Sequence, residues 1–224
     1  MSELFIYHHM GLGDHILCNA IVRNYAKLND KIYLFVKPHN HKNVSFMYRD
    51  LKNIDYIIGD DAVAQKYIID NNITNLLKVG FEKLDISRYR FDESFYRCIN
   101  MDFEKKWTDF YMERDLEKEK QVFESLNVVE GEYIFVQEDR NRGFTLDKSK
   151  IRTDLPVIYS DAPIDFFDLC YTIEKAREVH LMESSFKCLI DFLDNEGELF
   201  FHRYARKYPT NIECTSRKKW TIFN

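Results

Sequence analysis

Glycine, proline and long apolar runs are scarce in this chain of 224 residues, which has 7 glycines and 4 prolines. It has no Pro/Ser-rich linker, no low-complexity segment and no repeat of solenoid length, which excludes a repeat architecture. No stretch stays apolar for the roughly 18 residues that a membrane helix needs, and Met1 to Leu4 lack the basic start of a signal peptide. We therefore expect a cytoplasmic protein without a transmembrane segment.

Cysteine motifs and positive charge are also lacking. The five cysteines are odd in number, scattered and never arranged as Cys-x-x-Cys, which argues against a disulfide framework and a zinc ribbon. Acidic residues (37) outnumber lysines and arginines (32), so the formal net charge is −5. Such a chain lacks the electropositive field that draws proteins to nucleic acids or anionic membranes. We expect no nucleic-acid partner, and any site for an anion must be local.

What the chain does contain is enough apolar mass for a core, because 45% of its residues are hydrophobic and 18 are Phe. Short apolar runs alternate with helix-compatible segments, which is typical of parallel sheets covered by helices. The predicted strands are 4–7, 31–36, 55–58, 75–79, 133–136, 157–159, 179–182 and 199–201. The clearest predicted helices are 16–28, 105–126, 166–176 and 185–193.

This strand–helix series starts twice, once at the amino terminus and again after Gly131. The length suits one large domain or two small ones. We therefore predict an α/β fold made of two small Rossmann-like domains, the first over 1–128 and the second over 129–224.

The most informative stretch is His8 to Asn19, between the first strand and the first helix. Gly11 and Gly13 lack side chains, so a substrate can lie against the backbone where the open end of a parallel sheet binds ligands. Asp14 and His15 follow, where free helix amides favour negative charge. Asp14 is thus a candidate catalytic carboxylate, and the competing interpretation is that it only caps the helix.

Two other uses of this stretch are disfavoured. His8 and His9 are adjacent on a strand and should point to opposite faces, so they and His15 do not converge on a metal, and we expect no metal site. A dinucleotide site needs a third glycine where Ile16 stands and an acid near Phe35. Both discriminating residues are missing.

The second half carries its own candidate loop after the strand that ends at Val136. Arg140 and Arg142 precede Gly143, and the planar fork of arginine suits a pair of phosphate oxygens. The competing interpretation is a solvated hairpin in which Glu138 and Asp139 neutralise the arginines.

Further along, the run Glu183-Ser184-Ser185 follows a strand and opens a helix, so hydroxyls and helix amides can hold a phosphate or a hydroxyl-rich ligand. Capping explains one serine, and less readily the whole run. Between 198 and 224, two acids accompany six basic residues, Arg203, Arg206, Lys207, Arg217, Lys218 and Lys219. This local positive charge fits either a diphosphate or a solvated tail.

Two of these motifs carry a family resemblance. The run Gly11 to Leu17 resembles the glycine–aspartate loop of heptosyltransferase-like glycosyltransferases (the ADP-heptose:LPS heptosyltransferase family), and Glu183 to Phe186 resembles their serine-containing donor loop. The run Arg140 to Gly143 is more loosely similar to the basic loop of α-1,6-fucosyltransferase-like enzymes. Typical family members are longer than this chain.

The resemblance implies a compact GT-B fold, with two Rossmann-like domains facing across a cleft. It implies an inverting, metal-independent transfer of a sugar to a glycan or small hydroxyl acceptor, with Asp14 as the general base and His15 orienting it. His9, Gly11 and Gly13 would lie on the acceptor side.

On the donor side, the resemblance implies that Arg140, Arg142, Glu183, Ser184 and Ser185 bind the nucleotide-sugar. This co-substrate would be UDP-, GDP- or TDP-linked, and no cofactor would be tightly bound. Two alternatives stay open: a non-catalytic nucleotide- or sugar-binding module of the same fold, and another Rossmann-like enzyme such as a methyltransferase.

Overall fold

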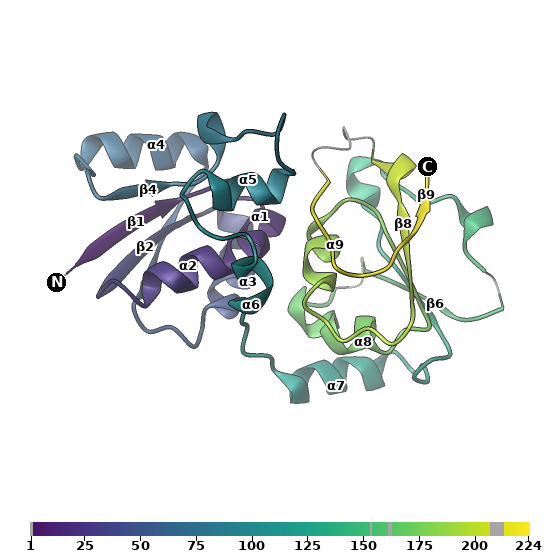
Figure 1. The fold of residues 1–224 in the computed structure, drawn as a ribbon. Coiled ribbons are helices and arrows are strands. Elements are labelled where there is room, and N and C mark those ends of the chain that lie inside the picture. The colour runs from purple at the N-terminus through teal and green to yellow at the C-terminus, as the bar shows by residue number, and fades with distance from the viewer. Residues whose placement is uncertain (1, 153, 161–162, 207–212) are drawn as a thin grey trace. The chain divides into compact units, whose positions relative to one another are not determined.

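A computed structural model describes residues 2–152, 154–160, 163–206 and 213–224 (Figure 1). Its contacts divide the chain into two compact units. Unit 1 comprises Met1–Glu113 and Thr210–Thr215, and unit 2 comprises Arg114–Pro209 and Ser216–Asn224. The division falls before the predicted boundary at 128/129, because the helix that precedes that boundary packs against a helix of the second unit.

Unit 1 contains a four-stranded sheet in which every strand is parallel to its neighbours, in the order β3-β2-β1-β4. The strands are β1 (Glu3–Tyr7), β2 (Lys31–Val36), β3 (Ile54–Ile58) and β4 (Leu76–Lys78). Side chains alternate between the two faces of a strand, and one face presents Phe5, Tyr7 and Phe35 to α4. The helix α2 covers the opposite face (Figure 1).

The helices of unit 1 are α1 (Leu12–Leu17), α2 (Asn19–Ala26), α3 (His41–Met47), α4 (Asp61–Asp70), α5 (Phe91–Arg97) and α6 (Lys105–Thr108), with 3₁₀ turns η1 (Pro38–Asn40) and η2 (Phe81–Lys83). The start of α4 shows why such segments are helical: the Asp60 side chain accepts the Val63 N–H at 2.9 Å and satisfies one free amide of the first turn. The predicted helix 16–28 is two helices, because α1 ends at Leu17 and α2 begins at Asn19.

The predicted long helix over 105–126 is wrong. It is divided into α6 and α7 (Leu116–Ser125), with a non-helical segment between them. The backbone of this segment is bound by the side chains of α2: Arg23 Nε donates to the Tyr111 carbonyl at 2.7 Å, and Asn19 bonds both the N–H and the carbonyl of Tyr111. These tertiary hydrogen bonds satisfy backbone groups that a continuous helix would have paired within itself. Apolar periodicity carries no information about such tertiary bonds.

A buried ion pair ties the returning segment 213–215 to unit 1. Lys106 Nζ donates to Asp92 at 2.6 Å and to the Thr215 carbonyl at 2.6 Å, and the Thr215 amide donates to Asp92 at 3.0 Å. The side chains of Lys106 and Asp92 are 1% and 0% exposed. Because each charge is paired and hydrogen-bonded, the pair is compatible with burial, and removing one partner would leave an uncompensated charge.

Unit 2 contains a five-stranded parallel sheet in the order β6-β5-β7-β8-β9. Its strands are β5 (Ile134–Val136), β6 (Val157–Tyr159), β7 (Glu178–Leu181), β8 (Glu198–His202) and β9 (Thr221–Phe223). Its helices are α7, α8 (Cys170–Glu174) and α9 (Ser185–Ile190), with 3₁₀ turns η3 (Arg140–Arg142), η4 (Lys148–Lys150), η5 (Phe167–Leu169) and η6 (Arg203–Ala205). The predicted helix 166–176 is thus a 3₁₀ turn followed by α8, and the helix predicted over 185–193 ends at Ile190.

The prediction of an α/β fold with two Rossmann-like units is confirmed, as are all eight predicted strands; β9 was not predicted. All five cysteines are free, and Cys18, Cys170 and Cys188 are buried. Among the described residues, no helix combines the length and apolar composition that crossing a lipid bilayer requires.

Candidate functional site

The predicted loops follow strands where the strand order reverses. In unit 1 the chain passes from β1 to β2 and β3 on one side and returns to β4 on the other, so the reversal lies between β1 and β4. In unit 2 it lies between β5 and β7. Open parallel sheets bind ligands at the carboxyl ends of their strands at such switch points. The loops after β1, β5 and β7 are therefore all in positions where ligands bind.

Asp14 lies in the first turn of α1, three residues after the N-cap Gly11, so it is not itself the N-cap. Its carboxylate folds back over Gly11, where a Cβ atom would lie only 2.6 Å from Asp14 Oδ2. Glycine leaves room for this approach. The Gly11 backbone also hydrogen-bonds the carboxylate, as an acid at this helical position does in a capping box. Asp14 therefore holds the turn after β1 while part of it stays exposed.

The pKa of Asp14 is raised to about 7, mainly because the carboxyl is buried. Hydrogen bonds from the Gly11 backbone and from its own backbone, and the positive charge of Lys37, lower this pKa, but burial outweighs them. A general base works best when its pKa lies near the working pH. The Asp14 carboxylate can therefore accept a proton from a bound hydroxyl far better than an ordinary aspartate.

His15 follows Asp14 on α1 but points into the core of unit 1. It is fully buried, and its ring packs edge-on against that of His8 with 4.4 Å between the centroids. Neither of its ring nitrogens has a hydrogen-bond partner in the described part of the chain. Burial, and then His8, hold the pKa of His15 well below its ordinary value, so the ring is neutral. The structure thus places His15 against His8 and not in a hydrogen bond with Asp14.

His9 connects the loop after β1 to the turn after β4, across the switch point. Its Nε2 accepts the Phe81 N–H at 3.1 Å, and burial lowers its pKa, so the neutral ring carries its proton on Nδ1. Gly80 makes this possible, since its φ is +89° and a Cβ there would lie 2.9 Å from the Phe95 ring. His8 packs on a different ring, so the two histidines point in different directions, as expected.

Three further residues, which were not predicted from the sequence, form a polar cluster at this edge. Lys37, directly after β2, forms an ion pair with Asp61 at the start of α4, with 3.0 Å between N and O. The Tyr7 hydroxyl donates to Asp61 at 3.0 Å, and burial together with this carboxylate raises the Tyr7 pKa to about 12. A signal was available, because these residues lie at or just after the ends of predicted strands, and parallel strands end at one edge of the sheet.

In unit 2 the two predicted arginines lie on the turn η3 after β5. Arg140 Nε donates to Glu138 Oε2 at 2.7 Å, and its guanidinium lies 4.3 Å from the centroid of the Tyr159 ring. Arg142 is paired with Asp139, whose pKa it lowers. The hairpin interpretation, in which the two acids neutralise the arginines, therefore describes the charges of this turn. The arginines remain half-exposed at the switch point.

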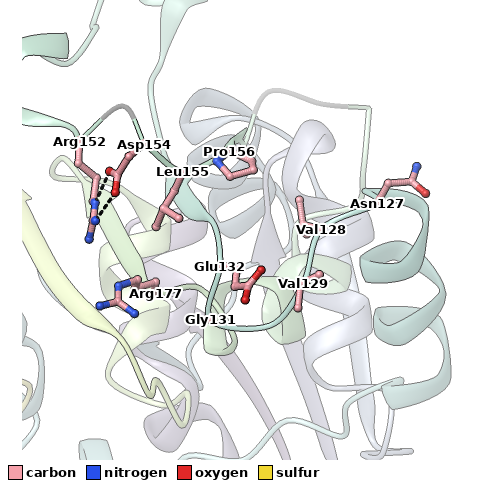
Figure 2. Close-up of a pocket in the computed structure, with 10 residues that line it drawn as sticks. All are labelled: Asn127, Val128, Val129, Gly131, Glu132, Arg152, Asp154, Leu155, Pro156 and Arg177. Atoms are coloured by element: carbon pink, nitrogen blue, oxygen red, sulfur yellow. Dashed lines mark hydrogen bonds and ion pairs between the residues drawn. The ribbon is translucent and has the colours of Figure 1, made fainter.

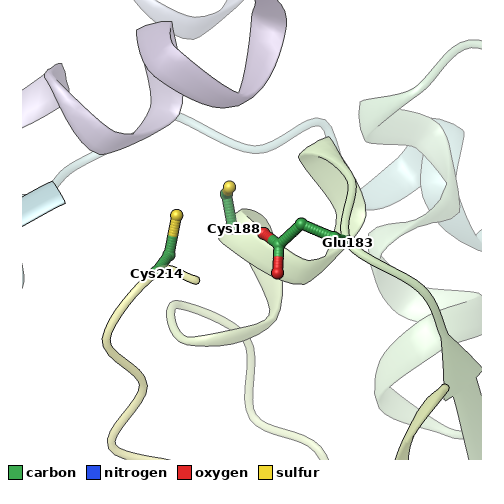
Figure 3. Close-up of side chains that lie close together, drawn as sticks. All are labelled: Glu183, Cys188 and Cys214. Atoms are coloured by element: carbon green, nitrogen blue, oxygen red, sulfur yellow. The ribbon is translucent and has the colours of Figure 1, made fainter. Parts of the chain in front are cut away.

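The second predicted loop of unit 2 follows β7 and opens α9, with Ser184 as the N-cap and Ser185 as the first helical residue. The Ser184 hydroxyl makes no capping bond; its oxygen is buried, and no hydrogen bond to another described residue satisfies it. Glu183 pairs with Lys187 one turn later, with 3.1 Å between N and O. Figure 3 shows the Glu183 carboxylate, just before α9, directed toward the side chain of Cys188 on that helix. The Ser184 hydroxyl is thus a buried polar group that the described residues leave without a hydrogen-bond partner.

Arg206 brings the two candidate loops of unit 2 together. Its Nη1 donates to the Glu183 carbonyl at 3.2 Å, and its guanidinium lies 5.6 Å from the ring centroid of Phe144, directly after the arginine turn. From the sequence, Arg206 was only one of six basic residues near the end of the chain. Lys207, its neighbour in that run, lies outside the described residues.

A pocket that the sequence did not predict lies at the opposite, amino-terminal edge of the unit 2 sheet (Figure 2). Its volume is about 540 Å³, and it is lined by Asn127, Val128, Val129, Gly131, Glu132, Arg152, Asp154, Leu155, Pro156 and Arg177. Arg152 pairs with Asp154 at 2.5 Å, as the dashed lines show. Two arginines and two acids balance in this lining, so its charge favours neither an anion nor a cation.

The class of fold is defined by comparison with solved structures. No protein-family model matches this chain, and no curated protein matches it in sequence. A glycosyl transferase family 9 protein from Veillonella parvula has a TM-score of 0.61 at 9% identity, covering 99% of this chain and 86% of that one. The ADP-heptose LPS heptosyltransferase II of E. coli has a TM-score of 0.62 at 7% identity, covering 100% and 90%.

At these identities the likeness shows the fold alone. The fold expected from the Gly–Asp and Glu–Ser–Ser motifs, that of heptosyltransferase-like glycosyltransferases, is confirmed. The match extends over essentially the whole chain, so both units take part in it.

Proposed function

We propose that this chain is a glycosyltransferase that moves a sugar from a nucleotide-sugar to a hydroxyl group of a glycan or small acceptor. The observation that carries the proposal is Asp14: a carboxylate with a pKa of about 7, at the switch point of the first sheet, in a chain with a glycosyltransferase fold. The proposed compartment is the cytoplasm.

In this mechanism the acceptor hydroxyl lies at the loop of His9, Gly11 and Gly13. Asp14 takes its proton while the hydroxyl oxygen attacks the anomeric carbon, and the bond from that carbon to the nucleoside diphosphate breaks, which inverts the configuration. The positive charge of Lys37, which is paired with Asp61, lowers the Asp14 pKa and so favours the ionised carboxylate. His15 has a structural part, since it anchors α1 in the core beside His8.

Unit 2 binds the donor in this proposal. The leaving diphosphate gains negative charge, which Arg140, Arg142 and backbone amides stabilise without a metal ion. Glu183, Ser184 and Ser185 bind hydroxyls of the ribose or the sugar, and the unpartnered Ser184 hydroxyl supports this role. The nucleotide is ADP, UDP, GDP or TDP; ADP joins the set because the E. coli neighbour is named for ADP-heptose.

One observation favours a second candidate, a binding module of the same fold without catalysis. Arg140 and Arg142 are each paired with an acid of their own turn, which reduces the positive charge that they offer to a diphosphate. Such a module would bind nucleotides weakly and release none from a sugar donor.

The test is to incubate the purified chain with ADP-, UDP-, GDP- and TDP-linked sugars and a panel of hydroxyl acceptors, and to measure release of the nucleoside diphosphate. Acceptor-dependent release from one donor is expected. A thermal-shift screen with the four nucleoside diphosphates, and with S-adenosylmethionine as the methyltransferase control, runs in parallel, because a ligand stabilises the folded state that binds it.

Each outcome decides between the candidates. Stabilisation by a nucleoside diphosphate without release from any donor supports the binding module. Stabilisation by S-adenosylmethionine alone contradicts both sugar-related candidates and supports a methyltransferase.

A further inference from the structure

A chain of hydrogen bonds runs along one face of the unit 2 sheet and ends at Asp147, a few residues after the arginine turn; its first two bonds are buried, and the last one is exposed. Glu178 Oε2 lies 3.1 Å from His180 Nε2, and His180 Nδ1 lies 2.8 Å from His202 Nε2. His202 Nδ1 lies 2.8 Å from the Tyr204 hydroxyl, which accepts the Asp147 N–H at 2.7 Å. We call Glu178, His180, His202 and Tyr204 the relay.

The parallel register explains how the relay forms. Glu178 and His180 are two residues apart on β7 and share one face of the sheet. His180 is paired in register with Phe200 on β8, so His202, two residues further, is its diagonal neighbour on the same face. The His180 ring stacks on Phe200 with 4.5 Å between centroids and 8° between planes, which fixes its orientation.

The position of every proton in the relay follows from its first member. Glu178 is ion-paired with Arg152 at 3.2 Å, and a carboxylate can only accept, so His180 Nε2 donates. A neutral His180 then accepts at Nδ1, so His202 Nε2 donates. A neutral His202 in turn accepts at Nδ1, so the hydroxyl of Tyr204 donates to it. Both histidines are therefore Nε2–H tautomers.

The surroundings keep both histidines neutral. His180 and His202 are 1% and 0% exposed, and burial lowers both pKa values, that of His202 to about 3. His180 and Lys150 lower the His202 pKa further, while Asp147 raises it. A proton added to either ring would put two donors face to face at one link, so the order of the relay depends on this neutrality.

The far end of the relay clamps the loop that carries the candidate donor arginines. Segment 138–147 is held at its start by Glu138, which accepts the Leu146 N–H at 2.8 Å as well as Arg140 Nε at 2.7 Å. It is held at its end by the bond from the Asp147 N–H to Tyr204. The hydroxyl of Tyr204 can face Asp147 with a lone pair because its proton points at His202.

We propose that the relay is a positioning device: His202 fixes the Tyr204 hydroxyl, which holds segment 138–147 and thereby the place of Arg140 and Arg142. Its effect on nucleotide binding rests on the proposed function, whereas its effect on the loop does not. His202 and Tyr204 are positioning residues, since they act through the loop.

The test uses the full chain labelled with ¹⁵N. Long-range ¹H–¹⁵N spectra are expected to show both histidines protonated at Nε2. Tyr204→Phe is expected to speed exchange of the Asp147 amide about 5-fold, the effect of losing one hydrogen bond. His202→Phe keeps a ring but removes both nitrogens, and it should also speed that exchange, because the hydrogen bond of His202 to Tyr204 is lost. Because both act on one chain, the double variant should be no faster than the faster single variant.

The matched control is Tyr171→Phe, which removes another tyrosine hydroxyl bond of unit 2, to Glu130 at 2.5 Å. It should leave the Asp147 exchange rate unchanged. Binding of ADP, UDP, GDP and TDP is measured by calorimetry on the same proteins. Tyr204→Phe should weaken the best of them about 5-fold, a change of about one hydrogen bond, and Tyr171→Phe should not.

Unchanged Asp147 exchange in Tyr204→Phe, or additive effects in the double variant, would overturn the positioning device. A looser loop with unchanged nucleotide affinity would overturn its link to the donor arginines. If the wild-type chain binds none of the four nucleotides, the proposed function fails, and the device is decided by exchange and histidine tautomers alone.

Discussion

The two units carry charge at the carboxyl edges of their sheets in opposite ways. In unit 1 Asp14 is largely buried, forms no ion pair with a described residue, and has a pKa raised to about 7. In unit 2 Arg140 and Arg142 are half-exposed and each is paired with an acid close in sequence. Burial disfavours the ionised form of the unpaired Asp14 carboxylate, so this carboxylate is a stronger base than an ordinary aspartate. Ion pairing instead favours the charged form of the arginines.

The sheet faces differ in the same sense. One face of the unit 1 sheet is aromatic and apolar, with Phe5 stacked on Tyr33 at 4.5 Å between centroids and covered by α4. In unit 2 the β7–β8 part of one face carries Glu178, His180 and His202 instead. One face of the unit 1 sheet is thus stabilised by aromatic packing, whereas the β7–β8 part of the unit 2 sheet carries a chain of hydrogen bonds.

The sharpest test of this comparison is Asp14→Asn, which should change activity and stability in opposite directions. We expect sugar transfer to fall by about 10²–10⁴-fold, the usual contribution of a general base. The folded pKa of about 7 exceeds the unfolded value of about 3.9, so the folded state keeps a proton that the unfolded state loses. The ionisation of Asp14 therefore lowers the free energy of unfolding progressively as the pH rises from about 4 to about 7. Above about pH 7 this loss of stability is complete and stays constant.

Replacing this carboxyl with an amide should accordingly raise the free energy of unfolding at pH 8, by about 2–4 kcal/mol from roughly 1.4 kcal/mol per pKa unit. Urea denaturation measures it. The control Asp70→Asn removes an exposed carboxylate paired with Lys66 and should change stability by less than about 1 kcal/mol. Wild-type turnover in Asp14→Asn would remove Asp14 from the mechanism.

A second test is the pH dependence of kcat/KM in the wild-type chain. Because the base must be ionised, the rate should rise about tenfold per pH unit below the Asp14 pKa and level off above about 7. An aspartate with an ordinary pKa would give a profile that is already flat at pH 5.5. The measurement is a series of initial rates at saturating donor from pH 5 to pH 9.

The smallest expected effect lies in unit 2. Glu138→Gln removes the charge that neutralises Arg140 but keeps an oxygen that can accept the Leu146 N–H. Nucleoside diphosphate should then bind about 2- to 5-fold more tightly, because the half-exposed Arg140 guanidinium is screened by solvent and its ion pair with the buried Glu138 is worth on the order of 1 kcal/mol. Calorimetric titration measures the change, and weaker binding would show that Glu138 holds Arg140 in place for the ligand.

The strands and the candidate loops were accessible from the sequence because both depend on local pattern. Short apolar runs such as Lys31 to Val36, which alternate with helix-compatible segments, are typical of buried strands in a parallel sheet. All eight predicted strands are present. Once the strands are known, the residues after them share one edge of each sheet, which is why Asp14, Arg140 and Ser184 were found. The same rule, applied to the strand that ends at Val36, would have found Lys37.

The other features depend on contacts between distant residues. The predicted helix over 105–126 is interrupted because Arg23 and Asn19 bind the backbone of Tyr111, and no periodicity reports such bonds. His15 looked like a partner for Asp14 because the two are adjacent, but on a helix adjacent residues point in different directions. Arg206 contacts both candidate loops of unit 2 although it lies far from the first of them in sequence.

The sequence by itself determined two series of parallel strands and helices, with glycine, acid, arginine and serine at the strand ends, because apolar spacing and turn chemistry act over a few residues. Only the tertiary structure decided which of those side chains differ chemically from free amino acids. Burial raised the Asp14 pKa, pairing neutralised the arginines, and the register of β7 and β8 aligned His180 with His202. The physical reason is that desolvation and hydrogen bonding depend on the groups that surround a side chain in space. In this protein some of those groups come from residues that are distant in sequence, such as His180 and His202.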